Sequence, residues 1–189
     1  MIDKEGTVII EKLLPELAAL EVSFEPQSGE DGVQHTLLNG EDVEKEIREM
    51  NVSNHVSPIA VIPEVRERMV EIQQNMGKQK GIVMDGRDIG TTVFPKAELK
   101  VFVNAGLHER AKRRWRELNQ KGIEISFEEV YSNLEERDRI DTSRKVSPLR
   151  KADDAYELDN GAITHEEQME WLLKHFHDTI ARIENESRN

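Results

Sequence analysis

The stretch KGIVMDGRDIGTTVFPKAELKVFVNA, residues 80–105, decides the fold. Short apolar runs near residues 82–85 and 99–103 flank a segment rich in Asp, Gly, Arg and Pro. Apolar runs bounded by turn residues are typical of buried strands, so we expect a strand at each of these two places. Charged groups at the end of a buried strand are costly unless something pairs with them. The DGRD motif at 85–88 therefore predicts polar ligand chemistry, or an internal ion pair, at a strand's carboxyl end.

Strand and helix patterns alternate after this stretch. The expected elements are a basic helix over 107–120, a helix capped by Ser126 and running to about 140, a strand at 155–159, and an amphipathic helix over 164–184. This alternation is typical of an α/β fold, in which helices cover a parallel sheet. In such sheets, ligands bind at the carboxyl ends of the strands.

The chain before residue 80 has a different pattern. Residues 7–20 have helical spacing. Residues 20–43 alternate around turn-rich segments, which predicts a hairpin, a second tight turn at Asn39-Gly40, and thus a small β-rich insert. Short helices follow, broken near Pro58 and Pro63. We therefore expect a domain over 1–79, with a partial core helix and the insert, and a core α/β domain over 80–189.

Composition excludes several classes of protein. The 189 residues carry a net charge of -12, which disfavours broad binding to nucleic acid or to an anionic membrane. The sequence has no Cys and therefore no disulfide or thiolate site. No apolar run is long enough to predict a membrane span. The His residues do not cluster at metal-ligand spacing. We therefore expect a soluble cytoplasmic protein.

Two charged motifs are the strongest candidates for binding an anion. In DGRD, Gly86 permits a sharp turn, Arg87 can fork onto a phosphate, and Asp88 can accept from an amine or hydroxyl. The alternative is a polar turn with an internal Arg–Asp pair. In ERDRIDTSR (136–144), the spacing of Arg137, Asp141 and Arg144 would place them on one helical face.

The alternative for this second motif is a solvated face held by ion pairs. Residues 137–151 form a locally basic patch in an acidic chain, however, and this favours an anionic ligand. A third basic segment, ERAKRRWRE at 109–117, is an ordinary exposed helix face, an anion site or the base of a lid.

Several segments, in this order along the chain, resemble the bacterial cytidylate kinase family. They are LNGEDVEKEIR, VSPIAVIPEVRERM, GIVMDGRDIGTTVFPKAELKVFVNA, ERAKRRWREL, ERDRIDTSRKVSPLRKADDAYELD and ITHEEQMEWL. The resemblance covers nearly the whole chain from about residue 20. It implies a P-loop kinase-like, three-layer parallel sheet with a CMP-binding insert. It also implies phosphorylation of CMP and dCMP from ATP, with Mg²⁺ as cofactor, by a protein that is monomeric at full length.

The resemblance implies roles for particular residues. Ser57, Arg66 and Asp88 would read the cytosine edge, and Arg137 and Asp141 would hold the ribose. These residue types suit the base, because cytosine presents an amine donor beside ring-nitrogen and carbonyl acceptors.

The phosphate side follows from the same resemblance. Arg87 and Arg144 would clamp the phosphate of the substrate, with Arg137 nearby, and these three arginines would be the catalytic residues. Asp85 would lie near Mg²⁺. The lid over ATP would lie near residues 110–150 and would include the basic-helix residues Arg113 and Arg114.

One departure from the family is large. The family has a glycine-rich phosphate loop, G-x-x-x-x-G-K-[ST], which the 189 residues do not contain. We therefore expect a cytidylate kinase chain without its first strands and ATP-binding loop, inactive on its own. The alternative is a catalytically dead nucleotide-binding or regulatory module. A nucleic-acid-binding protein is disfavoured by the net charge.

Overall fold

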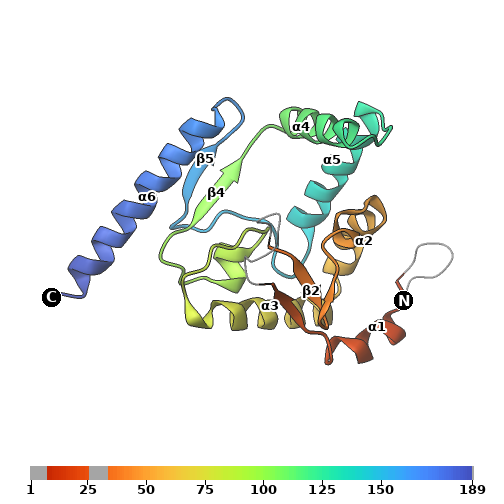
Figure 1. The fold of residues 1–189 in the computed structure, drawn as a ribbon, viewed down its shortest axis with the longest axis horizontal. Coiled ribbons are helices and arrows are strands. Elements are labelled where there is room, and N and C mark those ends of the chain that lie inside the picture. Colours follow the sequence, from red (N-terminus) through yellow and green to blue (C-terminus); the bar gives the residue numbers. More distant parts are fainter. Residues whose placement is uncertain (1–7, 26–33, 189) are drawn as a thin grey trace. The chain divides into compact units, whose positions relative to one another are not determined.

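The computed structural model describes residues 8–25 and 34–188 (Figure 1). The chain divides into two compact units, Met1–Met84 and Asp85–Asn189. No helix in the described ranges combines the length and the apolar composition needed to cross a membrane.

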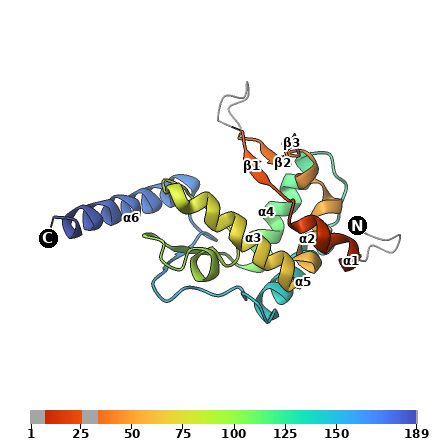
Figure 2. The same cartoon turned by 90° about the horizontal axis from the view of Figure 1, so that it is seen from below.

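A small antiparallel sheet forms the β-rich part of the first unit (Figure 2). Its strands are β1 (Val22–Phe24), β2 (Thr36–Leu38) and β3 (Glu41–Asp42), and they pair in chain order. Asn39 and Gly40 have φ angles of 51° and 83°, the left-handed pair that a tight hairpin turn requires. The predicted hairpin is therefore confirmed where it is described, while the turn at 26–33 lies outside the described residues.

The remaining elements of the first unit are helical. They are α1 (Ile10–Leu17), η1 (Glu46–Arg48), α2 (Met50–Ala60), α3 (Pro63–Met76) and η2 (Gly77–Gln79). Pro58 lies inside α2 and does not break it, whereas Pro63 opens α3, where its missing N–H costs nothing. Among the side chains of this unit that the structure describes, the buried apolar ones are Leu17, Val65 and Ile72.

The prediction of a strand at residues 82–85 is wrong. Residues 81–85 have no regular structure, and the side chain of Val83 is fully exposed. A strand requires a neighbour that accepts its backbone hydrogen bonds. No described strand of this chain pairs with residues 82–85, so the apolar run stays irregular.

A parallel strand pair is the centre of the second unit. β4 (Val101–Asn104) pairs with β5 (Tyr156–Asp159), with Val101 opposite Tyr156. Before β4, the π-helical turn η3 (Ile89–Val93) follows Asp88 directly. The predicted strands at 99–103 and 155–159 are thus confirmed within two residues, and the α/β class with a parallel sheet is confirmed with them.

Three helices accompany this pair. α4 (Leu107–Gln120) and α5 (Phe127–Ser143) pack against each other, and α6 (His165–Glu186) runs beside β5 (Figure 1). The ring of Tyr156 on β5 lies 4.4 Å from that of His175 on α6. α5 and α6 each begin with a capping box, Ser126 with Glu129 and Thr164 with Glu167, which confirms the predicted start of α5.

Candidate functional site

Asp141 is the hub of a buried ion-pair cluster in the second unit. Its side chain is 5% exposed; it lies 3.1 Å from Nε of Arg87 and 3.2 Å from NH1 of Arg144. Arg144 is 4% exposed and also approaches Asp88, at 3.9 Å. We call Arg87, Asp88, Arg137, Asp141 and Arg144 the Arg–Asp cluster. Two carboxylates and three guanidinium groups thus share one region, in which buried charges must be paired.

The end of α5 brings the later members of this cluster together. α5 ends at Ser143, and Arg144 turns out of the helix with an extended ψ of 142°. Its Nε then donates to the carbonyl of Ser147 at 2.7 Å, and the N–H of Leu149 donates to the carbonyl of Asp141 at 2.7 Å. The chain therefore folds back on the helix terminus, and Asp141 and Arg144 meet although Arg144 lies outside the helix.

Asp88 enters the cluster from the start of η3. Its side chain is 7% exposed, and its carbonyl accepts from the N–H of Thr92 at 2.8 Å. This hydrogen bond from the π-helical turn fixes the backbone of Asp88. π-turns of this kind are frequent at functional sites.

Arg137 adds an unbalanced positive charge. Its Nε is buried and has no hydrogen-bond partner among the described residues. Burial, and after it the positive charge of Arg87, lower the pKa of Arg137 from its ordinary value, although Asp141 opposes this shift. A buried guanidinium group whose charged form is disfavoured by a second guanidinium group favours the binding of an anion. The geometry therefore fits a phosphate better than a neutral ligand.

The residues predicted to read the base are divided between the units. Ser57 lies in α2, and its side chain is outside the described part of the structure. Arg66 lies in α3, half-buried, and its NH1 reaches the carbonyl of Ala60 at 3.5 Å. Asp88 belongs to the second unit. The joint action of these three residues therefore stays a prediction, as does the role of Asp85, which is exposed before the π-turn.

The two arginines assigned to ATP differ in their surroundings. Arg113 donates to the carbonyl of Asn160 at 2.7 Å, so it contacts the loop after β5. Arg114 pairs with Glu117 at 2.8 Å, and its charge also lowers the pKa of Arg137. Arg114 therefore acts electrostatically on the Arg–Asp cluster.

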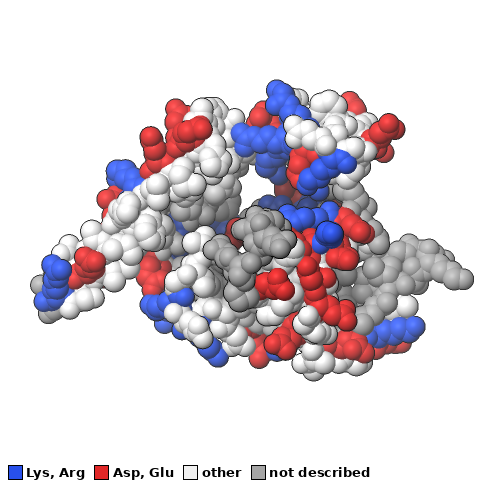
Figure 3. All heavy atoms as spheres, in the orientation of Figure 1, with Lys and Arg blue, Asp and Glu red and all other residues white. Residues whose placement is uncertain are grey.

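The exposed charges of α4 and α5 are largely matched. Lys and Arg side chains are mixed with Asp and Glu over this helix pair (Figure 3). Lys121, together with Arg114, holds the pKa of Glu117 below its ordinary value through hydrogen bonds. Much of the surface of α4 is therefore an ordinary exposed helix face with paired charges.

Two ion pairs of the second unit were not predicted from the sequence. Lys100 bonds Asp154, and Arg110 bonds Asp138 while also donating to the carbonyl of Ala105 at 3.0 Å. The signal for Lys100 was a lysine inside the apolar run LKVFV, where a charge needs a partner. Arg110 stood in a run of basic residues and carried no distinguishing signal.

Comparison with known proteins identifies the family. A family model described as cytidylate kinase matches residues 5–178. A cytidylate kinase of Porphyromonas gingivalis is 53% identical over 176 residues, covering 93% of this chain and 76% of the relative. That of Bacteroides thetaiotaomicron is 56% identical over 172 residues, covering 90% of this chain and 75% of the relative. The chain therefore belongs to the cytidylate kinase family.

Proposed function

We propose that this chain carries the CMP-binding part of a nucleoside monophosphate kinase acting on CMP and dCMP. The observation that supports this most strongly is the Arg–Asp cluster, in which Arg87 pairs with the buried carboxylate of Asp141 and Arg137 adds a positive charge beyond those that the two carboxylates balance. In this proposal Arg87, Arg137 and Arg144 hold the substrate phosphate. Asp141 orients Arg87 and Arg144 and accepts from the ribose hydroxyls.

Base recognition in the proposal uses three residues. Asp88 accepts from the exocyclic amine of cytosine, while Arg66 and Ser57 donate to its ring nitrogen and carbonyl. Uracil carries a carbonyl where cytosine carries the amine, and a carboxylate repels it. The buried, backbone-anchored position of Asp88 supports this role, because a fixed acceptor discriminates better than a mobile one.

The transfer step needs positioning more than protein nucleophiles. An oxygen of the CMP phosphate attacks the γ-phosphorus of ATP, and the bond from that phosphorus to the ADP oxygen breaks. The arginines of the cluster neutralise the approaching phosphate and orient it. Arg114, with Arg113 beside it on α4, would stabilise the ATP side.

Asp85 is the candidate residue for Mg²⁺. Mg²⁺ takes most of its ligands from water and phosphate oxygens and one or two from carboxylates. An exposed single carboxylate such as Asp85 fits that donor set. The ion would neutralise phosphate charge when bound.

We further propose that the 189-residue polypeptide binds CMP but does not phosphorylate it by itself. Its sequence contains no glycine-rich G-x-x-x-x-G-K-[ST] loop to cradle the phosphates of ATP. The same observation favours a second candidate, a nucleotide-binding or regulatory module without turnover. Adding the phosphate-loop segment of a relative distinguishes the two, because only the kinase fragment would gain ADP formation with ATP, Mg²⁺ and CMP.

The central test is the titration of CMP and UMP into the wild type and Asp88→Asn by calorimetry. Loss of a charge-assisted hydrogen bond should weaken CMP by about 1.5–3 kcal/mol, while UMP changes little. Asp153→Asn, an exposed neutralisation in the same unit, is the matched control and should preserve the CMP-to-UMP ratio. An unchanged ratio in Asp88→Asn would remove Asp88 from base recognition.

A further inference from the structure

Lys100 is a buried cation that the proposed chemistry does not use. Its side chain is 6% exposed at the entrance to β4. Nζ donates to the carbonyl of Pro95 at 2.6 Å and to both carboxylate oxygens of Asp154 at 2.8 Å. Burying an ammonium group is costly, and an apolar residue of the same size often stabilises a protein as well or better. Stability alone therefore does not explain a buried lysine at this position, and its charge is expected to have another role.

The first segment that Lys100 holds is the turn that begins at Asp88. Pro95 follows η3 almost directly, and the N–H of Phe94 donates to the carbonyl of Ile89 at 2.7 Å. Gly90 lies over the aliphatic part of Lys100, so closely that an added Cβ would lie 3.3 Å from Cδ. Lys100 thus packs against Gly90 within the turn and, through Pro95, holds the end of the turn that lies away from Asp88.

The second segment leads from the Arg–Asp cluster to β5. Asp154 lies just before β5, where the N–H of Tyr156 also donates to the carbonyl of Lys100 at 3.0 Å. The same connection starts at the cluster, where Leu149 bonds the carbonyl of Asp141. Lys100 therefore joins the segment that supplies Asp88 to the segment that follows Asp141.

We propose that Lys100 is a positioning residue for cytosine recognition, holding the turn from Asp88 to Pro95 in place through its bonds to Pro95 and Asp154. This inference rests on the proposed function, because it gives Lys100 its role through Asp88. The carboxylate of Asp154 is 66% exposed, so it serves as the outer anchor of the ammonium group. Lys100 itself does not touch the substrate in this arrangement.

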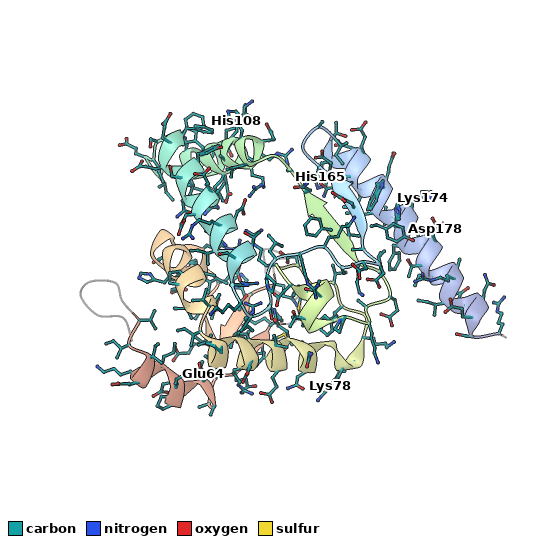
Figure 4. All side chains as sticks on the ribbon, turned by 180° about the vertical axis from the view of Figure 1, so that it is seen from behind. Glu64, Lys78, His108, His165, Lys174 and Asp178 are labelled. Carbon is teal, nitrogen blue, oxygen red and sulfur yellow. The ribbon has the colours of Figure 1, made fainter. Side chains whose placement is uncertain are left out.

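The test compares CMP and UMP affinities in Lys100→Met, which keeps the length of the side chain and removes its donors. Loosening of the turn should lower the CMP-to-UMP affinity ratio by about fivefold, the equivalent of one neutral hydrogen bond. Lys174→Met is the matched control, because Lys174 and Asp178 form an exposed 2.7 Å pair on α6 of the same unit (Figure 4). The CMP-to-UMP affinity ratio of this variant should stay at the wild-type value.

A second variant protects the test against misfolding. Asp154→Ala removes only the exposed anchor, and it should lower the ratio in the same direction by about twofold, as expected for a partly lost contact. A lower melting temperature with an unchanged ratio in both variants would make Lys100 a purely structural residue and overturn the inference. A wild type that does not prefer CMP over UMP would overturn the proposed function, and the inference with it.

Discussion

Arg87 and Arg137 bring like charges together where one of them is partly desolvated. An anion that binds between them relieves this repulsion and stabilises the folded state by mass action. We expect inorganic phosphate to raise the melting temperature of the wild type. At ten times its dissociation constant, the gain should be about 1.4 kcal/mol. Thermal unfolding in phosphate and in chloride of equal ionic strength measures this effect.

Arg137→Gln should lose most of that phosphate effect. Arg139→Gln is its control, since Arg139 lies two residues along the same helix, is exposed, and pairs with Glu136 at 2.6 Å. Equal phosphate stabilisation in both variants would show that the anion binds elsewhere.

Asp154 gives a prediction about pH. The hydrogen bond from Lys100 lowers the pKa of Asp154, because the carboxylate form is favoured in the folded state. A lowered folded pKa means stabilisation that is complete above the unfolded value of about 3.9 and is lost as pH falls through the folded value. We therefore expect Asp154→Ala to be less stable than the wild type at pH 5–8, with a difference that disappears at strongly acidic pH. Urea unfolding as a function of pH measures it; a difference that persists in acid would point to packing instead.

At the scale of elements, the capping box of α5 can be separated from the site that α5 carries. The hydroxyl of Ser126 accepts from the N–H of Glu129 at 3.2 Å, and the Glu129 carboxylate accepts from the N–H of Ser126 at 3.0 Å. Ser126→Ala should cost about 1 kcal/mol of stability. CMP affinity should hold, because Asp141 lies at the opposite end of the helix.

Ser132→Ala is the control for this cap, since Ser132 is exposed in the middle of α5 and Ala favours helix there. Urea unfolding and calorimetry of both variants provide the measurements. A loss of CMP binding in Ser126→Ala that matches its loss of stability would mean that α5 behaves as one cooperative piece with the Arg–Asp cluster.

Elements with their own local signals were predictable from the sequence. α4 and α6 have helical periodicity, Ser126 has its acidic partners three residues on, and Asn39-Gly40 forces a hairpin turn. The prediction of a strand at 82–85 was wrong, because a strand needs a neighbouring strand and an apolar run alone does not supply one.

The candidate site was also predictable only in part. The spacing of Arg137, Asp141 and Arg144 correctly indicated proximity, although a turn and not a shared helical face brings Arg144 in. The π-turn after Asp88 has no local signature, and the bond from Lys100 to Asp154 joins residues far apart in sequence. Such contacts depend on the tertiary fold.

On the scale of the whole molecule, an exposed apolar stripe on α6 bears on association. Met169, Leu173, Phe176 and Ile180 recur at helical spacing on α6, and each is at least 41% exposed. Contiguous apolar stripes of this kind mark association surfaces. We expect the 189-residue polypeptide to be marginally stable and to self-associate at micromolar concentration, despite its net charge of -12.

Sedimentation velocity over a range of concentrations tests the association. Leu173→Gln with Phe176→Gln should shift the distribution toward monomer, whereas Lys174→Gln, on the same helix but polar, should not. A monomer at all concentrations in the unmodified polypeptide would show that the stripe does not drive association.

The pairing of β4 with β5 has a consequence for how the second unit folds. These strands are neighbours in the sheet, yet the whole of α4 and α5 lies between them in the chain. Closing such a long loop costs entropy before any strand contact compensates for it. α4 and α5, in contrast, meet through nearby residues. Helical structure should therefore form early in refolding, and the β4–β5 pairing should be the slow step.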